Sequence, residues 1–478
     1  MSGYTFDPVD NGGVLLGLRA PQLGALGAGG ILALVCAAVI SGAIGALLAV
    51  LTLLGAIAVA CWPIHGQPPI AWLPITGGWL ARRASGPTRS PAPEQGTVSD
   101  VAQMVRWPPP PGGAGGPRRR HVPASPPGTA PGGVTLLDVP GVTGDAPMGM
   151  VRDRRSGTWV AALTVGARSF TLLDTEDQRR RLGSWGSLLA GMARPASPVT
   201  RVQWLQTVAP ADPSALRLPT GGAVGAQADY AEVVAVAGPA ARQHTTLVVV
   251  AVRPRRGGAD PATVLRREVR LVQGQLANAD LLPGPPLDLP ALTAAVRCRF
   301  DPGSGGRRGA WPMASDEAWS AVRVDGGWHA TYWIAEWPRV ETGPDFLVPL
   351  LLAGGRRTVS VTMGPVPAAR ATREVESART ASLADDELRR RAGFLATARR
   401  QRQADGVARR EAELADGHAE FRFSGYVTVC GDDRAALDGA CAEVEHAAQA
   451  AHLELRRLWG RQAEAFTWTL PLARGLRS

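Results

Sequence analysis

One stretch limits what this chain can fold into more than any other. From Leu23 to Trp62 there is no Asp, Glu, Lys, Arg or His, and Ser41 and Thr52 carry the only hydroxyl groups. A membrane-spanning helix needs about 20 predominantly apolar residues, and this run is about twice that long. Because Ser41-Gly42 lies near its middle, the run predicts two transmembrane helices, over 22–41 and 44–62, joined by a tight turn. The alternative is a buried hairpin of a soluble protein, but soluble helices normally keep a polar stripe.

The charges beside this run predict its orientation. Arg19 precedes it, and Arg82, Arg83 and Arg89 follow it. Arg residues in short flanking segments favour the cytoplasmic side. We therefore expect an inner (plasma) membrane location, with two transmembrane helices and both termini in the cytoplasm.

Residues 63–134 divide into a membrane-proximal part and a linker. Trp72 and Trp79 predict an amphipathic segment on the inner leaflet that completes an N-terminal unit over 1–83. Residues 84–134 are rich in Pro and Gly and predict a spacer. Within it, Arg118, Arg119 and Arg120 form a basic cluster that is a candidate contact for an anionic partner, such as the lipid bilayer.

The basic residues of the chain are unusual in type. There are 51 basic and 41 acidic residues, a net charge of +10, and every basic residue is Arg. Without Lys, a Walker A phosphate loop and a Lys Schiff base are both excluded. The positive charge suits the cytoplasmic face of a membrane at least as well as nucleic acid. The five Cys residues include no C-x-x-C pair, so neither a disulfide framework nor a zinc site is indicated.

Strand and helix patterns alternate from about residue 134 onward. Asp174, Asp260 and Asp432 stand where they can cap helices, and 247–252 is a continuous apolar run typical of a buried strand. Similar alternation before and after residue 300 predicts an α+β body of two related subdomains, over 135–300 and 301–478. A ferredoxin-like fold is the specific hypothesis for each.

No pattern indicates catalysis. The glycine-rich stretch 303–309 lacks the spacing of a phosphate loop, and 183–187 resembles a serine nucleophile motif only loosely, within a helical pattern. His418 lies near several carboxylates but without a second His on the same helix face, which does not favour a metal site. We therefore predict a non-enzyme with no catalytic residue, cofactor or metal ligand.

An Arg-rich segment over 373–410 includes Arg389, Arg390 and Arg391. These three are further candidates for contact with an anionic partner. Acidic residues interleave with the arginines or flank them, and few aromatic side chains are available for base stacking. A solvated helix or helical hairpin with i,i+4 ion pairs is favoured over a nucleic-acid-binding surface.

Tryptophans gather in the second subdomain. Trp328, Trp333 and Trp337, with Arg339, are candidates for a protein interface, because Trp and Arg are enriched at binding hot spots. The alternative is that Trp333 and Trp337 are core residues.

Two parts of the chain resemble components of bacterial secretion machines. The hairpin, entered through Gly13-Val-Leu-Leu-Gly-Leu-Arg-Ala-Pro21, resembles the PrgI-like two-helix inner-membrane subunits of type IV secretion and conjugation systems. The body resembles the N-terminal, non-ATPase half of the VirB-type conjugation ATPase. The segments that carry this second resemblance are Gly149-Met-Val-Arg-Asp153, Leu182-Gly-Ser-Trp185, Arg201-Val-Gln-Trp204, Thr331-Tyr-Trp-Ile-Ala-Glu-Trp-Pro-Arg339, Arg410-Glu-Ala-Glu-Leu-Ala-Asp-Gly-His418, Leu458-Trp-Gly-Arg-Gln462, Ala465-Phe466 and Leu470-Pro-Leu472.

Together these segments resemble an actinobacterial family of membrane proteins from conjugation-like loci. The resemblance implies a chain that has the docking half without the motor, because the sequence stops at Ser478, before a nucleotide-binding half. It implies a non-catalytic scaffold that forms an oligomeric complex with a separate cytoplasmic ATPase and other membrane subunits. The alternatives are a type VII secretion-like membrane component, which shares the layout, and a membrane-tethered nucleic-acid-binding protein.

Overall fold

The computed structural model describes most of the hairpin and of the body. The described ranges are 20–40, 42–62, 67–84, 133–141, 146–167, 173–194, 196–211, 224–237, 241–255, 257–301, 311–312, 315–340, 342–343, 345–391 and 398–476. The cluster Arg118–Arg120 lies outside these ranges.

The apolar run forms two antiparallel helices, α1 (Ala20–Val39) and α2 (Ala43–Cys61), as predicted. Both are long and apolar enough to cross a membrane. Gly29 makes their close packing feasible, because a Cβ at this position would collide with the Cβ of Ala56. The amide Nε2 of Gln22 donates to the carbonyl of Ala60 at 2.7 Å and joins the two ends nearest the body.

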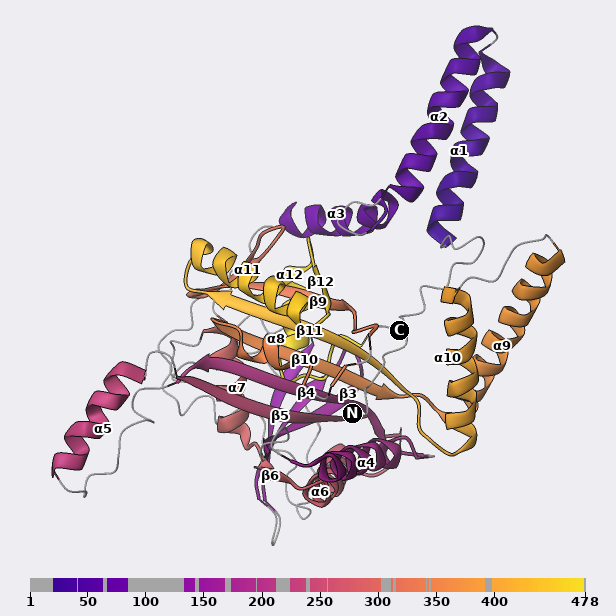
Figure 1. Cartoon of the computed structure of the whole chain (residues 1–478). Coiled ribbons are helices and arrows are strands. Elements are labelled where there is room, and N and C mark those ends of the chain that lie inside the picture. Colours follow the sequence, from indigo (N-terminus) through magenta and orange to yellow (C-terminus); the bar gives the residue numbers. More distant parts are fainter. Residues whose placement is uncertain are drawn as a thin grey trace, which may run out of the picture.

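A third helix, α3 (Pro69–Ala84), connects the hairpin region to the rest of the structure. It contains Pro74 and ends on Arg82 and Arg83. It lies across the top of the body, at a steep angle to α1 and α2 (Figure 1).

The body is built on one twelve-stranded antiparallel sheet. Its main path runs β1-β2-β3-β5-β4-β10-β11-β9-β8-β7, with β6 paired to β3 and β12 paired to β9. The strands are β1 (Val134–Val139), β2 (Met148–Asp153), β3 (Thr158–Ala167), β4 (Val199–Pro210), β5 (Arg242–Val252), β6 (Leu281–Pro286), β7 (Ser315–Glu317), β8 (Val322–Val324), β9 (Gly327–Glu336), β10 (Arg356–Pro365), β11 (Phe421–Gly431) and β12 (Glu454–Arg457).

Helices connect and cover these strands. They are α4 (Thr175–Met192), α5 (Val224–Ala237), α6 (Pro261–Asn278), α7 (Leu289–Phe300), α8 (Val348–Leu352), α9 (Ala368–Arg391), α10 (Ala398–Ala415), α11 (Arg434–Ala450) and α12 (Gln462–Phe466), and the 3-10 helix η4 (Thr467–Thr469) follows. Asp174 and Asp260 cap α4 and α6, as predicted. The cap of α11 is Asp433 rather than the expected Asp432.

The same strand order occurs twice. In the first half, β3-α4-β4-β5-α6-β6 form four strands in the order β6-β3-β5-β4; in the second, β9-α8-β10-β11-α11-β12 form the order β12-β9-β11-β10. Each unit is preceded by a two-stranded hairpin, β1-β2 or β7-β8, that pairs with the start of its first strand. The body is therefore a tandem structural repeat, and β4 pairs with β10 to join the two halves into one sheet.

Helices bury both faces of this sheet. On one face, α4 and α6 cover the first repeat and α8 and α11 cover the second. The apolar stripe of α11, Leu437, Cys441, Val444 and Ala448, is buried there. On the other face, α7 and the segment from α12 onward pack against strands of both repeats. The prediction of a mixed α+β body is confirmed.

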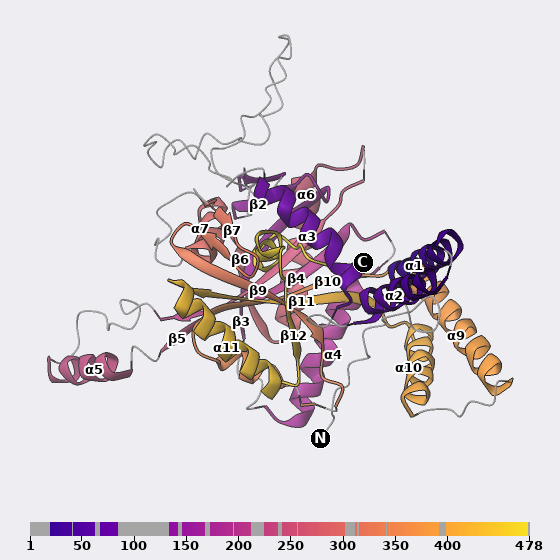
Figure 2. The same ribbon diagram turned by 90° about the horizontal axis from the view of Figure 1, so that it is seen from above.

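Two insertions project from equivalent places in the repeats. The link between β4 and β5 contains α5, and the link between β10 and β11 contains α9 and α10. Figures 1 and 2 both place these insertions on opposite sides of the body. The predicted helical hairpin in the Arg-rich segment is thus observed, with Arg379 of α9 paired to Glu411 of α10 at 2.5 Å.

Candidate membrane-proximal interface

The helix α3 docks on the body through tryptophan. Trp72 and Trp79 are seven residues apart, which places them on one face of α3. Both rings contact Trp319 of the body, with centroid distances of 5.9 and 5.4 Å. The second contact is edge-to-face, one of the geometries that aromatic pairs prefer.

Polar contacts continue this interface toward the end of α3. The Nε of Arg82 lies 3.0 Å from Oε2 of Glu317, and its Nη2 donates to the carbonyl of Gly460. The other oxygen of Glu317 accepts the backbone N–H of Ala463, at the start of α12. One carboxylate therefore connects α3 to the second repeat.

The backbone conformation and the close neighbours of Gly460 require glycine at this position. Its φ is +67°, and a Cβ there would come within 2.6 Å of the Trp319 ring and 3.0 Å of Ile75. Glycine thus allows α3, Trp319 and the chain between β12 and α12 to approach closely.

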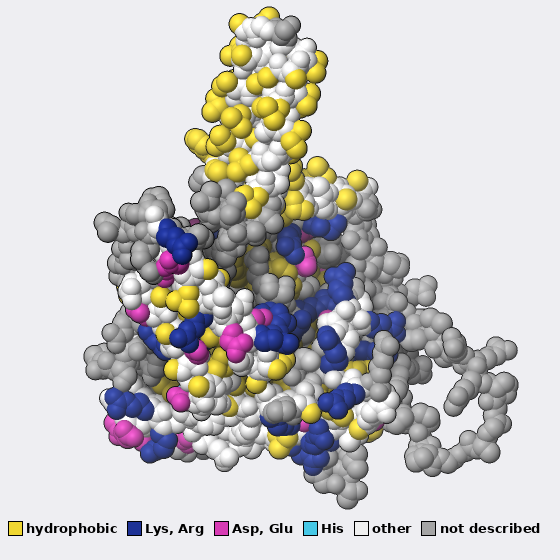
Figure 3. Space-filling model, turned by 90° about the vertical axis from the view of Figure 1, so that its right-hand side faces the viewer, with side chains coloured by type: hydrophobic (Ala, Val, Ile, Leu, Met, Phe, Trp, Pro, Cys, Tyr) yellow, Lys and Arg dark blue, Asp and Glu magenta, His cyan; other side chains and the backbone are white. Residues whose placement is uncertain are grey.

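A second face of α3, about 100° around the helix axis from the tryptophans, is apolar and exposed. Leu73 and Leu80 are 64% and 57% exposed. Figure 3 shows hydrophobic side chains over the visible face of the α1–α2 hairpin, whereas the body below carries mixed basic and acidic side chains. Trp72 and Trp79 predict from the sequence an amphipathic segment on the inner leaflet; in the structure both rings contact Trp319, and Leu73 and Leu80 present the exposed apolar face.

The predicted interface tryptophans do not share one surface. Trp328 packs partly buried against the core under α11, with the guanidinium groups of Arg323 and Arg434 over its ring. Trp337 packs against the same core and makes edge contacts with Phe346 and Phe423.

The other two candidates lie apart from that core. Trp333 is half-buried on β9, and strand alternation places it on the face opposite Trp328. Arg339 is exposed and pairs with Glu336. A docking role for Trp333 and Arg339 stays a prediction.

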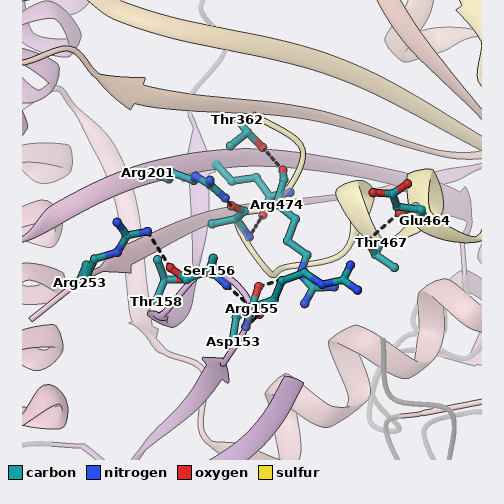
Figure 4. A network of polar contacts seen from close by, with 12 residues as sticks. Asp153, Arg155, Ser156, Thr158, Arg201, Arg253, Thr362, Glu464, Thr467 and Arg474 are labelled. Carbon is teal, nitrogen blue, oxygen red and sulfur yellow. Dashed lines mark hydrogen bonds and ion pairs between the residues drawn. The ribbon is translucent and has the colours of Figure 1, made fainter. Parts of the chain in front are cut away.

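A polar network holds the C-terminal segment on the sheet (Figure 4). The guanidinium of Arg474 lies 2.8 Å from Asp153, at the end of β2. The carbonyl of Arg474 accepts the hydroxyl of Thr362 on β10, and the carbonyl of Ala473 accepts a guanidinium N–H of Arg201 on β4. Gln203 of β4 also accepts the backbone N–H of Ala473. The segment is thus bound to strands of both repeats.

Asp153 makes this network sensitive to pH. Burial raises the pKa of its carboxyl group, but Arg474 and the backbone N–H of Arg155 outweigh burial and leave the pKa below its ordinary value. A lowered pKa in the folded state stabilises the protein above the unfolded-state pKa of about 3.9, and this contribution is lost as pH falls through the folded-state pKa.

We expect Asp153→Asn to destabilise the protein by roughly 1–3 kcal/mol at neutral pH, because a charge-assisted contact is lost. The difference from the unchanged protein should shrink as the solution is acidified below the folded-state pKa. Urea unfolding at neutral and acidic pH checks both statements. Asp316→Asn, an exposed change on β7, is the control, and equal effects of the two substitutions would contradict the prediction.

Other buried ionisable groups have structural partners. Arg297 on α7 is fully buried and pairs with Asp325 at 2.7 Å and Asp301 at 3.3 Å. Burial lowers the pKa of His329 to about 4, so its ring is neutral at pH 7 and its Nε2 can donate to the carbonyl of Phe300. In the parts of the chain that the structure describes, no group of three His, Cys, Asp or Glu side chains is placed to hold a metal ion.

The arginine candidates of the Arg-rich segment lie at the end of α9. Arg389, Arg390 and Arg391 form the last turn of α9, and the side chain of Arg391 is exposed and pairs with Glu387 at 2.9 Å.

The sequence does not predict the body residues that contact α3, which are Trp319, Glu317 and Gly460. Trp319 could have been noted as a further Trp beside an acidic residue, but its partners lie over two hundred residues earlier.

No protein-family model matches the chain, and no curated protein matches it.

Proposed function

We propose that this protein is a non-catalytic inner-membrane scaffold of a type IV secretion or conjugation-like system, which docks a separate cytoplasmic ATPase. The hairpin α1–α2 spans the plasma membrane, with both termini in the cytoplasm. The body then presents two repeats to soluble partners and to other membrane subunits in an oligomeric complex.

The observation that carries the proposal is the position of α3. It follows directly after the two candidate spans, presents Leu73 and Leu80 on one face, and binds Trp319 with the adjacent face that carries Trp72 and Trp79. A helix with this arrangement holds the body against the membrane surface. The absence of Lys from the sequence supports a partner ATPase, because the chain has no Walker A lysine of its own.

The repeated strand order supports the ferredoxin-like interpretation of each repeat. A β-α-β-β-α-β unit with its fourth strand beside its first and its third between first and second has the connectivity of that fold. On this proposal the scaffold is a fused pair of such units.

Co-purification tests the proposal. The full chain, tagged and solubilised in mild detergent, should retain an ATPase with a Walker A motif that is encoded by a neighbouring gene. Failure to associate, with both proteins folded, would count against the scaffold, and steady ATP hydrolysis by the purified chain alone would overturn the non-catalytic assignment.

A further inference from the structure

The hairpin of α9 and α10 projects toward the same side of the body as the membrane helices. It leaves the sheet after β10 and returns to it at β11. In Figure 1 its free end, where α9 ends and α10 begins, reaches about the height at which α1 begins. Figure 2, viewed from above, places this hairpin beside α1 and α2 rather than across the body from them.

Charge is separated along this hairpin. We define the basic tip as residues 388–391 of α9 and 398–404 of α10; it contains six Arg and no acidic residue. The lower part, 368–387 and 405–420, contains five Arg and ten acidic residues.

Several acidic residues of the lower part have basic partners nearby. Glu374 pairs with Arg370 and Arg422, and Glu420 pairs with Arg410. These ion pairs anchor the hairpin where it joins the sheet. At the tip, the pair of Arg391 with Glu387 is solvent-exposed, and exposed pairs are weak. Positive charge therefore accumulates at the free end of the hairpin, which rises to about the level where α1 begins in Figure 1.

We propose that the basic tip binds anionic lipid headgroups of the membrane that α1 and α2 span. This inference rests on the membrane insertion stated under the proposed function. Clusters of Arg next to a membrane span are attracted to the negative surface potential of the cytoplasmic leaflet, and the attraction acts within about a Debye length. The tip gives the body a second attachment, separate from α3.

The first repeat contains a natural contrast. Its insertion at the equivalent position, α5, has no basic residue and carries Asp229 and Glu232. Both figures place α5 on the far side of the body from α9 and α10. Only the insertion that rises beside the membrane helices carries a basic tip, which favours a lipid surface over a soluble polyanion as its partner.

Hydrogen exchange of the full chain in lipid nanodiscs tests this proposal. The discs contain phosphatidylcholine alone or an equal mixture with phosphatidylglycerol. Each Arg close to an anionic surface contributes roughly a fivefold factor to the bound equilibrium. We expect backbone exchange at the two helix ends of the tip to slow in the anionic discs, and added salt to reverse the effect.

A pair of matched variants identifies the charges responsible. Arg390→Gln with Arg391→Gln should reduce the lipid-dependent protection by about 25-fold, two such factors. Arg373→Gln with Arg409→Gln removes the same charge from exposed positions of the lower part and should leave the protection unchanged. Exchange in α5 should not respond to lipid charge in any variant.

The outcomes separate this proposal from the one on which it rests. A chain that remains in the discs but shows equal tip exchange in both lipid mixtures would overturn the lipid contact and leave membrane anchoring intact. A chain that does not remain in the discs would overturn both. Equal protection of the tip by a short DNA duplex in neutral discs would assign it to nucleic acid instead.

Discussion

Replacing Arg297 by Met should destabilise the protein by about 3–5 kcal/mol, the cost of breaking a buried ion pair from one side. The Arg297 side chain is 0% exposed, and its partner Asp325 is 8% exposed. Removing the guanidinium leaves the Asp325 carboxylate buried without its cation. Since domains are stable by only about 5–15 kcal/mol, this is the largest single effect we expect. Urea unfolding of the detergent-solubilised chain, followed by tryptophan fluorescence, measures it.

This effect should depend on burial rather than on the loss of an Arg. Arg356→Met is the control, because Arg356 pairs with an Asp432 that is 87% exposed, and exposed pairs contribute at most about 1 kcal/mol. Adding Asp325→Asn to Arg297→Met should recover part of the loss by removing the unpaired charge. Equal destabilisation by the two Met variants would contradict the prediction.

The position of this ion pair explains its importance. Arg297 is on α7, which follows the last strand of the first repeat, whereas Asp325 lies in the turn between β8 and β9, where the second repeat begins. The pair therefore joins the repeats on the face of the sheet that α7 covers.

Replacing Trp319 by Ala should release α3 from the body. The two ring contacts of Trp319 contribute about 0.5–1.5 kcal/mol each beyond area burial. Their loss should lower the docked population of α3 by roughly 5- to 150-fold, because each 1.4 kcal/mol is a factor of ten. Hydrogen exchange of α3 and of residues 457–463, with the full chain in nanodiscs, reports the docked state.

The control for this prediction is on the neighbouring, exposed face of the same helix. Leu80→Ala removes an apolar side chain that is 57% exposed, and it should leave the exchange of 457–463 unchanged. Unaltered protection of α3 in Trp319→Ala would show that Arg82 and its partners hold the helix without the rings.

Local patterns predicted the elements of this fold well. Asp174 and Asp260 were identified as helix caps because a cap depends on a side chain and a backbone N–H only three residues away. For α11 the same reasoning predicts a cap at Asp432, because two adjacent Asp residues give the same local signal. In the structure the cap is Asp433, which accepts the N–H of Ala436. Helix α7 was missed, since its two buried Arg residues interrupt the apolar pattern of a core helix.

Contacts between distant residues could not be predicted in this way. The pairing of β4 with β10 joins residues 149 to 161 positions apart, from Arg357 with Val208 to Met363 with Val202, and either strand could have been an edge. Likewise, Trp72 and Trp79 had the signature of a membrane interface, and only the folded body provides the Trp319 ring that they contact. The candidate site therefore depended on which surfaces meet, a property that periodicity does not encode.

The pairing of β4 with β10 has a consequence for how this protein can be divided. Each strand is the edge strand of its own four-stranded unit. The backbone groups of the two strands pair with each other from Met363 opposite Val202 to Arg357 opposite Val208. A single repeat made alone would expose that row of N–H and C=O groups, which is a template for self-association. The two repeats thus form a dimer within one chain, and their covalent link prevents the uncontrolled pairing that separate copies would undergo.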